Sequence, residues 1–300
     1  MAAATTRGGA GRRPYEGRWD GLWLLGPLLL FLAALLGFPA VANLVYSLSE
    51  VRFTGLWSPR WVGLDNYRAV LADPAFWGAV GFSARFAVVV TAAQLLLGFA
   101  LVLALDPLIA KRRWLMAFLL LPMMVSPALL GVMYRLMLND FVGVIPQYLQ
   151  LVGFSDNLLG VDWVFTTVAV IEVLQWTPFA FLALLTAYQA IPGELVEAAR
   201  IDGAGSWSVF RRITLPLMVP ALAITGFIRF IDSFRVFDHI YVLTGGGPGT
   251  LTQSLSIYIY RTFFQQERIG PAVAASMLLL LASVVLLRLL MAQMLKGSRR

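Results

Sequence analysis

The chain alternates between long apolar runs and short polar segments. A helix needs about 20 consecutive apolar residues to cross a bilayer, and six runs reach that length, at 21–48, 82–105, 114–138, 164–187, 217–239 and 270–293. The third run carries Pro122 and Pro127, which predict a kink in its helix. The pattern therefore predicts an all-α membrane protein with six transmembrane helices.

These runs also predict the organisation of the chain. Residues 1–20 form a polar, basic N-terminal tail, residues 21–294 form one transmembrane domain, and residues 295–300 form a basic C-terminal tail. Ala40 and Ala42 have the spacing of a signal-peptide cleavage site, but the apolar run before them is too long for a signal peptide. We therefore expect the first run to be retained as a membrane span.

The composition excludes a soluble globular chain. Of the 300 residues, 59% are hydrophobic and 13% are charged, and the mean hydropathy is +0.78, whereas soluble domains are about half apolar and about a quarter charged. The chain has no cysteine and a single histidine, His239, which excludes a disulfide framework, a thiol nucleophile and a multi-histidine metal site. We expect no metal site.

The distribution of Lys and Arg predicts the orientation. The two tails and the segments 106–113 and 188–216 carry thirteen of these residues, whereas the segments 49–81, 139–163 and 240–268 carry five. Basic residues are enriched in cytoplasmic loops and attracted to anionic lipids, so the net charge of +7 needs no nucleic-acid partner. Both termini and the 188–216 segment are expected on the cytoplasmic side, and an even number of spans agrees with both termini lying on one side.

The segment 188–216 is polar and amphipathic, although membrane-length runs flank it on both sides. Pro192 is placed to start a helix with glutamates in its first turns, where the helix dipole favours negative charge. Gly203 and Gly205 are expected to end this helix, because glycine tolerates the left-handed conformation at a helix C terminus. A second helical face follows and is closed by Pro216, so the segment is predicted to be a helix–turn–helix elbow on the membrane surface.

The elbow resembles a known signature. Its EAA triplet at 197–199, followed by glycine and then by Ile-x-Leu-Pro, resembles the EAA motif of binding-protein-dependent ABC importer permeases, and GLDNY at 63–67 resembles their carbohydrate branch. The resemblance implies the type I ABC importer permease fold and an elbow that docks in a cleft of an ATPase subunit; the alternative is an ordinary amphipathic surface helix. The residues that it assigns to ATPase coupling are Glu197, Ala198, Ala199, Asp202, Gly203, Ile213, Leu215 and Pro216.

The resemblance also implies the partners. A cytoplasmic ABC ATPase dimer is expected to bind ATP and Mg, since this chain contains no phosphate-binding loop and is expected to need no cofactor of its own. A second permease subunit, giving a heterodimer, and an extracytoplasmic sugar-binding protein are expected besides the lipid bilayer. The location implied is the cytoplasmic (inner) membrane of a bacterium or archaeon.

Two polar stripes lie inside the predicted spans, where charged residues are costly and point to a cavity or a partner. Carboxylates and amides can pair with sugar hydroxyls, while an aromatic ring covers the apolar face of a pyranose. In maltose-type importers, the resemblance places substrate-contacting positions on these stretches, although several residue types differ here. The substrate-pathway candidates are Glu172, Gln175, Trp176 and Phe179 on the fourth span and Arg229, Asp232, Ser233 and Val236 on the fifth. The alternative is that the charges, with Arg235 and Asp238 beside them, form ion pairs that hold the bundle together.

The Gly-rich loop at 245–250 and His239 are both expected near the outer side of the membrane. The Gly-rich loop at 245–250 lacks the Lys-Ser/Thr of a phosphate-binding loop; the resemblance implies that it faces the binding protein, and a plain turn is the alternative. His239 is expected to be an interfacial hydrogen-bonding group at the outer end of the fifth span.

The function predicted is therefore that of a permease subunit in an ATP-driven, binding-protein-dependent importer. It would form half of the pathway for a sugar or oligosaccharide, and it is not itself an enzyme. Glycerol phosphate or another polar solute remains an alternative cargo. A secondary transporter driven by an ion gradient would require an internal inverted repeat, and a membrane enzyme would require convergent catalytic groups; neither is found in the sequence.

Overall fold

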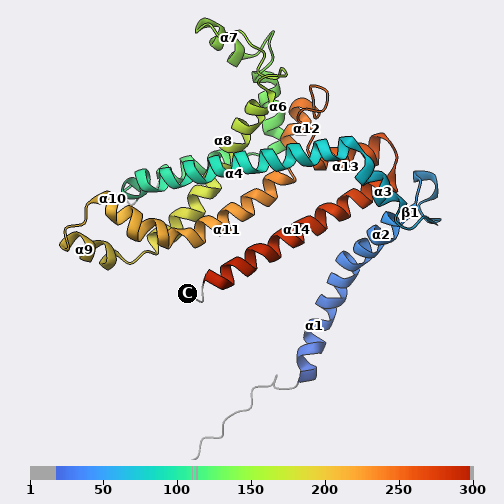
Figure 1. Cartoon of the computed structure of the whole chain (residues 1–300), viewed down its shortest axis with the longest axis horizontal. Helices are drawn as coiled ribbons and strands as arrows, with labels where there is room; N and C mark the ends of the chain where they lie inside the picture. Colours follow the sequence, from blue (N-terminus) through green and yellow to red (C-terminus); the bar gives the residue numbers. More distant parts are fainter. Residues whose placement is uncertain (1–17, 110, 113, 298–300) are drawn as a thin grey trace, which may run out of the picture.

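The computed structural model describes residues 18–109, 111–112 and 114–297 of the chain. The elements, coloured along the chain in Figure 1, are α1 (Arg18–Leu32), α2 (Phe38–Ser47), β1 (Ser49–Glu50), β2 (Arg60–Trp61), α3 (Asp65–Ala72), α4 (Pro74–Ile109), α5 (Trp114–Met124), α6 (Pro127–Met137), α7 (Val144–Leu151), α8 (Val164–Gln189), α9 (Gly193–Ile201), α10 (Ser206–Val209), α11 (Leu215–Phe234), α12 (Asp238–Thr244), α13 (Leu255–Tyr260) and α14 (Ile269–Gly297). The all-α prediction holds for the described residues, apart from the two-residue strands of one antiparallel hairpin.

The centre of the molecule is formed by α4, α8 and α11 (Figure 1). Buried apolar side chains from these three helices form one core cluster, which contains Val102, Phe181 and Met218. The approach of α4 to α8 depends on Gly98, where an added Cβ would lie 3.0 Å from the Phe181 backbone nitrogen. Close backbone contact at a small residue is a common way for helices to pack within a membrane.

Four helices are long and apolar enough to cross a membrane: Leu25–Ser47, Pro74–Ile109, Val164–Gln189 and Ser206–Thr244. The pair α5 and α6 passes the same test only as a broken span, and α14 contributes an apolar stretch over Ile269–Val285. Each of the six predicted runs therefore corresponds to a helix or a helix pair. The count of six spans and the cytoplasmic placement of the termini stay predictions.

The third run is where the sequence-based expectation was furthest from the structure. It was expected to be one kinked helix, but α5 and α6 meet at an angle of 84°. Pro127 begins α6, and Ser126 lies in an extended conformation before it, as the residue before a proline tends to do. The two prolines therefore bracket a complete break in the helix rather than a kink.

Two other helix boundaries also differ from the expectation. α4 begins at Pro74 rather than Phe82, and the Asp73 carboxylate caps it by accepting a hydrogen bond of 2.9 Å from the Ala75 N–H. The fifth span was expected to continue to His239, but α11 ends at Phe234 and α12 starts anew at Asp238.

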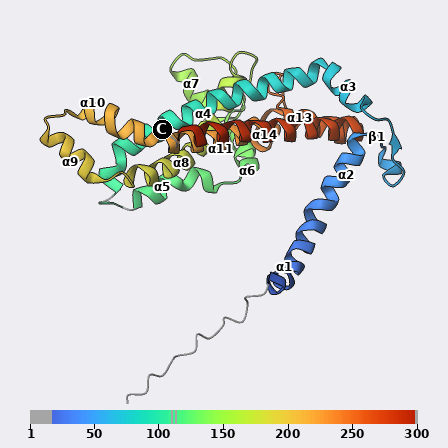
Figure 2. The same ribbon diagram turned by 60° about the horizontal axis from the view of Figure 1, so that its bottom comes forward.

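The N-terminal helices lean away from the bundle (Figures 1 and 2). Within Leu25–Ser47, no residue of the most apolar stretch is buried. The end of α2 is nonetheless tied down, because the buried Asn66 amide donates to the carbonyls of Ser47 and Ser49 at 3.0 and 2.9 Å. The Tyr67 hydroxyl adds a hydrogen bond of 3.0 Å to Ser47 Oγ. The GLDNY segment thus fixes the joint between α2 and the rest of the molecule.

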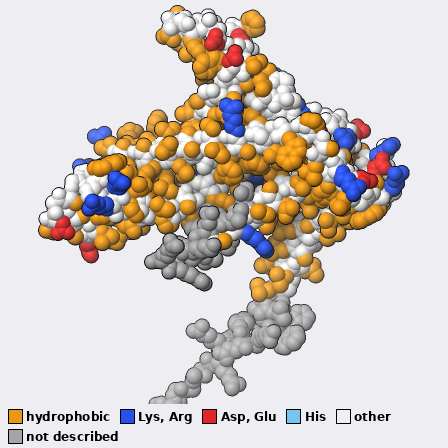
Figure 3. All heavy atoms as spheres, viewed as in Figure 1, with side chains coloured by type: hydrophobic (Ala, Val, Ile, Leu, Met, Phe, Trp, Pro, Cys, Tyr) orange, Lys and Arg blue, Asp and Glu red, His pale blue; other side chains and the backbone are white. Residues whose placement is uncertain are grey.

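The surface in Figure 3 agrees with a membrane protein. Hydrophobic side chains cover the sides of the bundle, while basic side chains gather at the end that carries α9 and α10 and at the opposite end near the β hairpin. Such a distribution places apolar atoms against lipid and charges at the two interfaces.

Candidate functional site

A buried ion pair connects the two polar stripes. Arg229 on α11 donates from Nη2 to Glu172 Oε1 on α8 at 2.7 Å, and the two side chains are only 1% and 3% exposed. Ser233, one turn after Arg229, donates to the same carboxylate oxygen at 3.3 Å. Buried charges of this kind are stable only when they are paired and hydrogen-bonded, and both conditions are met here.

Gln94 brings the third helix into this network. Its Oε1 accepts from Arg229 Nε at 2.9 Å, and its Nε2 donates to the Glu172 carbonyl at 3.2 Å. The side chain is fully buried on α4. One cluster of Gln94, Glu172, Arg229 and Ser233 therefore joins α4, α8 and α11, and we call it the buried polar cluster.

Two more ionisable groups border the cluster. Asp232 lies 3.5 Å from Arg229 Nη1 and accepts from Arg235 Nη2 at 3.2 Å. His239 is 1% exposed, with Nδ1 3.6 Å from Glu172 Oε2. The expectation that His239 is an interfacial group is wrong: the break after α11 turns α12 inward and buries the imidazole.

A cavity of about 300 Å³ opens beside the buried polar cluster. Trp176 contributes an aromatic surface to it, with the Arg229 guanidinium 4.6 Å from the ring centroid. Its lining residues come from α6, α8, α11, α12 and the α11–α12 connection: Pro127, Glu172, Trp176, Arg229, Asp232, Arg235, Val236, Phe237, Asp238 and His239. Carboxylates beside an aromatic ring can hydrogen-bond hydroxyl groups and cover an apolar ring face.

The structure brings together most of the predicted pathway residues. Glu172, Trp176, Arg229, Asp232 and Val236 line this cavity, and Ser233 belongs to the cluster beside it. Val236 reaches it from beyond the end of α11, so it does not continue the helical face that its spacing had indicated.

Two predicted residues lie outside the cavity lining. Gln175 is buried and donates from Nε2 to the Val125 carbonyl at 3.0 Å, so it satisfies a backbone group freed by the break between α5 and α6. Phe179 is not among the lining residues.

Sequence reasoning missed Gln94 and the inward position of His239. For Gln94 a signal existed, because it is the only strongly polar side chain in the apolar run 86–105. Its partners could not be read from the sequence, since they lie 78 and 135 positions away.

The elbow forms one end of the molecule (Figure 1). Pro192 stands at the N-cap of α9, as expected, and Gly203 follows the helix with φ +83°. The Ala204 N–H returns to the Ala199 carbonyl at 2.9 Å, which closes the last turn. Gly205 was expected to break the helix in the same way, but its φ of −71° is ordinary and it precedes α10.

The second part of the elbow is continuous with α11. Helix α10 passes through a π-helical segment, Phe210–Thr214, directly into α11. Pro216 is the second residue of α11 but lies inside this continuous helix, directly after the π-helical segment, and it does not close the elbow as expected. Trp207 stacks on Phe210, and the ring centroid of Phe210 lies 6.0 Å from that of Phe99 on α4.

The predicted coupling residues lie mostly at the surface of this elbow. No residue of α9 is buried. Glu197, Ala198, Asp202, Gly203 and Pro216 are exposed, whereas Ala199, Ile213 and Leu215 are half-buried. Large apolar side chains are exposed here as well, Ile201 to 86% and Trp207 to 70%. Two cavities, of about 460 and 410 Å³, flank α9, so this end offers both protruding and hollow surface.

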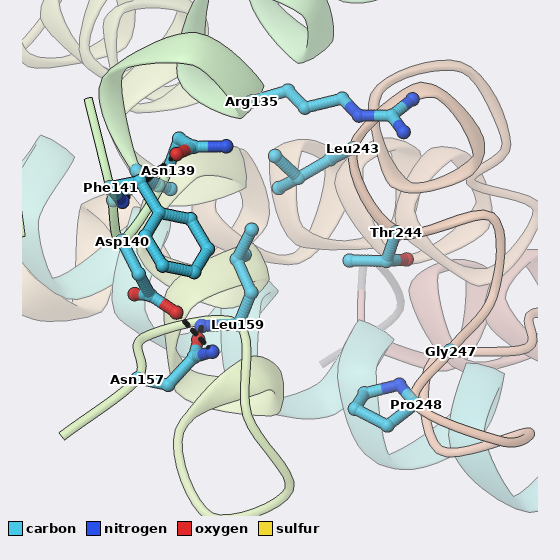
Figure 4. A pocket seen from close by; sticks show the side chains of 11 residues that line it. Arg135, Asn139, Asp140, Phe141, Asn157, Leu159, Leu243, Thr244, Gly247 and Pro248 are labelled. Atoms are coloured by element: carbon cyan, nitrogen blue, oxygen red, sulfur yellow. Dashed lines mark hydrogen bonds between the residues drawn. The ribbon is translucent and has the colours of Figure 1, made fainter. Parts of the chain in front are cut away.

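A further pocket of about 380 Å³ lies at the Gly-rich loop. Figure 4 shows Arg135 and the side chains that follow α6 facing Thr244, Gly247 and Pro248 across this pocket. Asn157 Nδ2 donates to Asp140 Oδ2 at 2.5 Å, and this hydrogen bond joins the segment before α7 to the segment after it. We call this hollow the outer pocket.

Comparison with known proteins identifies the family. The family described as "Binding-protein-dependent transport system inner membrane component" matches residues 96–296. The chain belongs to this family. This importer permease is similar to the probable ABC transporter permease protein y4oQ of Sinorhizobium fredii, with 34% identity over 85% of this chain and 83% of that protein. It is also 34% identical to the trehalose/maltose transport system permease protein MalF of Thermococcus litoralis, over 90% of this chain and 92% of that protein.

A solved structure supports the fold of this importer permease. A chain of a bacterial alginate ABC transporter, solved in complex with an alginate pentasaccharide-bound periplasmic protein, superimposes with a TM-score of 0.72. The match covers 91% of this chain and 92% of that chain at 23% sequence identity. The type I importer permease fold expected from the elbow motif is thus confirmed.

Proposed function

We propose that the chain is the membrane subunit of an ATP-driven importer that carries a sugar or oligosaccharide, and that it forms half of the translocation pathway. The single observation that carries the proposal is the elbow. It places the EAA sequence on a helix without buried residues at one end of the bundle (Figure 1). Relatives such as the trehalose/maltose permease support a sugar as the cargo.

The elbow has the properties of a docking element for an ATPase. Its exposed Ile201 and Trp207 provide apolar contact area, and Glu197 and Asp202 provide exposed charge. Because α10 runs into α11 without interruption, a displacement of the docked elbow reaches the helix that carries Arg229 and Ser233. ATP and Mg would be bound by the partner dimer, and this chain would only transmit the movement.

The cavity beside the buried polar cluster is the proposed solute site. It combines carboxylates with the Trp176 ring, and it is lined by α8 and α11, the two helices that flank the elbow. A second permease subunit, different from this one, would complete the site, and an extracytoplasmic binding protein would deliver the solute at the outer pocket and the Gly-rich loop. The elbow and both termini would face the cytoplasm of a bacterial or archaeal cell.

Reconstitution of the complete importer in proteoliposomes tests the coupling role. Glu197→Lys is expected to abolish both solute uptake and binding-protein-stimulated ATP hydrolysis, while the subunit still inserts. Asp162→Lys, a matched charge reversal at an exposed site in the loop before α8, is the control and should retain uptake. Normal uptake by the Glu197 variant would contradict the assignment of the elbow.

The orientation can be tested because the chain has no cysteine. A single Arg200→Cys substitution is expected to react with a membrane-impermeant maleimide only in inside-out vesicles, and Asp156→Cys only in intact cells. Labelling of the Arg200 position from the outside would overturn the proposed topology.

A further inference from the structure

The Arg229 guanidinium is fully engaged by groups of the protein. Its Nε donates to Gln94 at 2.9 Å and its Nη2 to Glu172 at 2.7 Å and to Ser233 at 3.4 Å. Its Nη1 faces Asp232 at 3.5 Å, and the Trp176 ring covers one face of the group. Each of the three nitrogens therefore has a partner, either in the buried polar cluster or in the neighbouring Asp232, and recruiting this cation for an anionic solute would break buried hydrogen bonds.

The other side chains of the cavity offer acceptors in excess. Three carboxylates, those of Glu172, Asp232 and Asp238, line it together with two guanidinium groups. Arg235, the second of these, already donates to Asp232. Among the described residues Asp238 has no ion-pair partner, and Nε2 of the buried His239 has no hydrogen-bond partner. This Nε2 is enclosed by the protein, so the acceptors that are accessible from the cavity are the carboxylates of Asp232 and Asp238.

We infer that the solute held by this cavity is an uncharged, hydroxyl-donating sugar and that anionic sugars are rejected. This inference rests on the proposed function, because it assigns a substrate class to the same site. Sugar hydroxyls can donate to the acceptors that the protein leaves open, and the Trp176 ring can cover the apolar face of the sugar. A carboxylate, sulfonate or phosphate would face three carboxylates against two guanidinium groups, of which Arg229 is buried and Arg235 is already paired with Asp232, and like charges placed together oppose binding.

The inference gives this chain a cargo whose charge differs from that of its structural relative. The superimposed transporter imports alginate, an acidic polysaccharide, so the shared fold does not determine the charge of the cargo. It also separates the two cargo classes that the sequence had left open, and it selects the uncharged sugar over glycerol phosphate.

Saturation-transfer difference NMR on the complete importer in nanodiscs, without binding protein or nucleotide, tests the inference directly. The probes are three pairs of methyl glycosides: glucose and glucuronate, galactose and galacturonate, mannose and mannuronate. Each pair differs only in the oxidation of C6. At least one neutral member is expected to show saturation transfer that is lost in Trp176→Leu. Its acidic partner is expected to bind more weakly by a factor of at least about ten.

A charge variant checks that the carboxylates cause the discrimination. Asp238→Asn is expected to reduce the difference between the neutral and acidic members, whereas Asp162→Asn, a change in the loop before α8 and outside the cavity lining, should leave it unaltered. Equal or tighter binding of an acidic member, or no signal that depends on Trp176 in any pair, would overturn the inference.

Transport assays distinguish this failure from failure of the proposed function. If the complete importer with its binding protein and ATP accumulates a uronate, it is a sugar importer and only the charge inference is wrong. If it accumulates neither class while its ATPase is intact, the proposed function itself is wrong.

Discussion

Breaking the pair between Glu172 and Arg229 should destabilise the subunit far more than breaking an exposed pair. Glu172→Gln keeps the shape of the side chain and an acceptor oxygen but leaves the Arg229 charge, 1% exposed, without its buried counter-ion, so that only the part-exposed Asp232 still faces it. Removal of one partner of a buried pair costs about 3–5 kcal/mol. By contrast, neutral interhelical hydrogen bonds in membranes average about 0.6 kcal/mol, so the charge, and not the hydrogen bond, dominates the expected loss.

The assay is equilibrium unfolding of the purified subunit in lipid–detergent micelles with increasing SDS. The double variant Glu172→Gln/Arg229→Gln removes both charges, so its loss should be smaller than the sum of the single losses by about 2–3 kcal/mol. The matched control is Asp65→Asn, which breaks the exposed pair with Arg68, whose side chains are 69% and 80% exposed. That pair should contribute only roughly 0.2–0.5 kcal/mol.

Two results would refute the reasoning. A loss below about 1 kcal/mol for Glu172→Gln would mean that the pair is no more than a neutral hydrogen bond. Additive single and double variants would mean that the two charges do not depend on each other, whatever their distance.

Three further substitutions have outcomes that follow from the backbone and from buried hydrogen bonds. Gly203→Val places a β-branched residue at φ +83°, which should cost about 1–2 kcal/mol, and it should lower ATP-driven uptake in proteoliposomes by distorting the elbow. Gly98→Leu inserts a side chain where a Cβ already lies 3.0 Å from a backbone nitrogen of α8; overpacking should cost roughly 1–3 kcal/mol in SDS unfolding. Asn66→Ala leaves two carbonyls at the α2 end without their donor, so proteolysis between α2 and α3 should become faster.

Each of these substitutions has a control nearby. Gly205→Ala stands at φ −71° and should leave uptake unchanged, while Gly78→Ala, with no atom within 4 Å of its Cβ, should unfold like the parent. Tyr67→Phe removes a single hydrogen bond at the same joint and should speed proteolysis less than the Asn66 substitution does. Equal effects in a substitution and its control would count against the local explanation.

Much of the fold could be predicted from local patterns. The fourth run became α8 within two residues, and Pro192 and Gly203 bound the first elbow helix as their backbone preferences require. These features depend on the residues at the position itself. The resemblance of the elbow to the EAA motif added the family and the fold, which no single pattern of polarity could have provided.

The remaining features depended on residues far apart in the sequence. At the bend between α5 and α6, the freed Val125 carbonyl accepts its hydrogen bond from Gln175 on another helix. Likewise, Gln94 lies one turn before Gly98, where α4 approaches α8 closely, and its partners are on α8 and α11. Sequence spacing could group Arg229 with Ser233, but it could not show that His239 turns back into the same site.

The uninterrupted rod from Ser206 to Phe234 has a mechanical consequence. At 1.5 Å per residue its length is roughly 43 Å, with Trp207 near one end and Arg229 near the other. A tilt of about 10° around its midpoint would move each end by roughly 4 Å in opposite directions, more than a hydrogen bond can stretch. Because α10 and Arg229 belong to one continuous helix, a tilt driven from the elbow would stretch the contact between Arg229 and Glu172 unless α8 tilts with it.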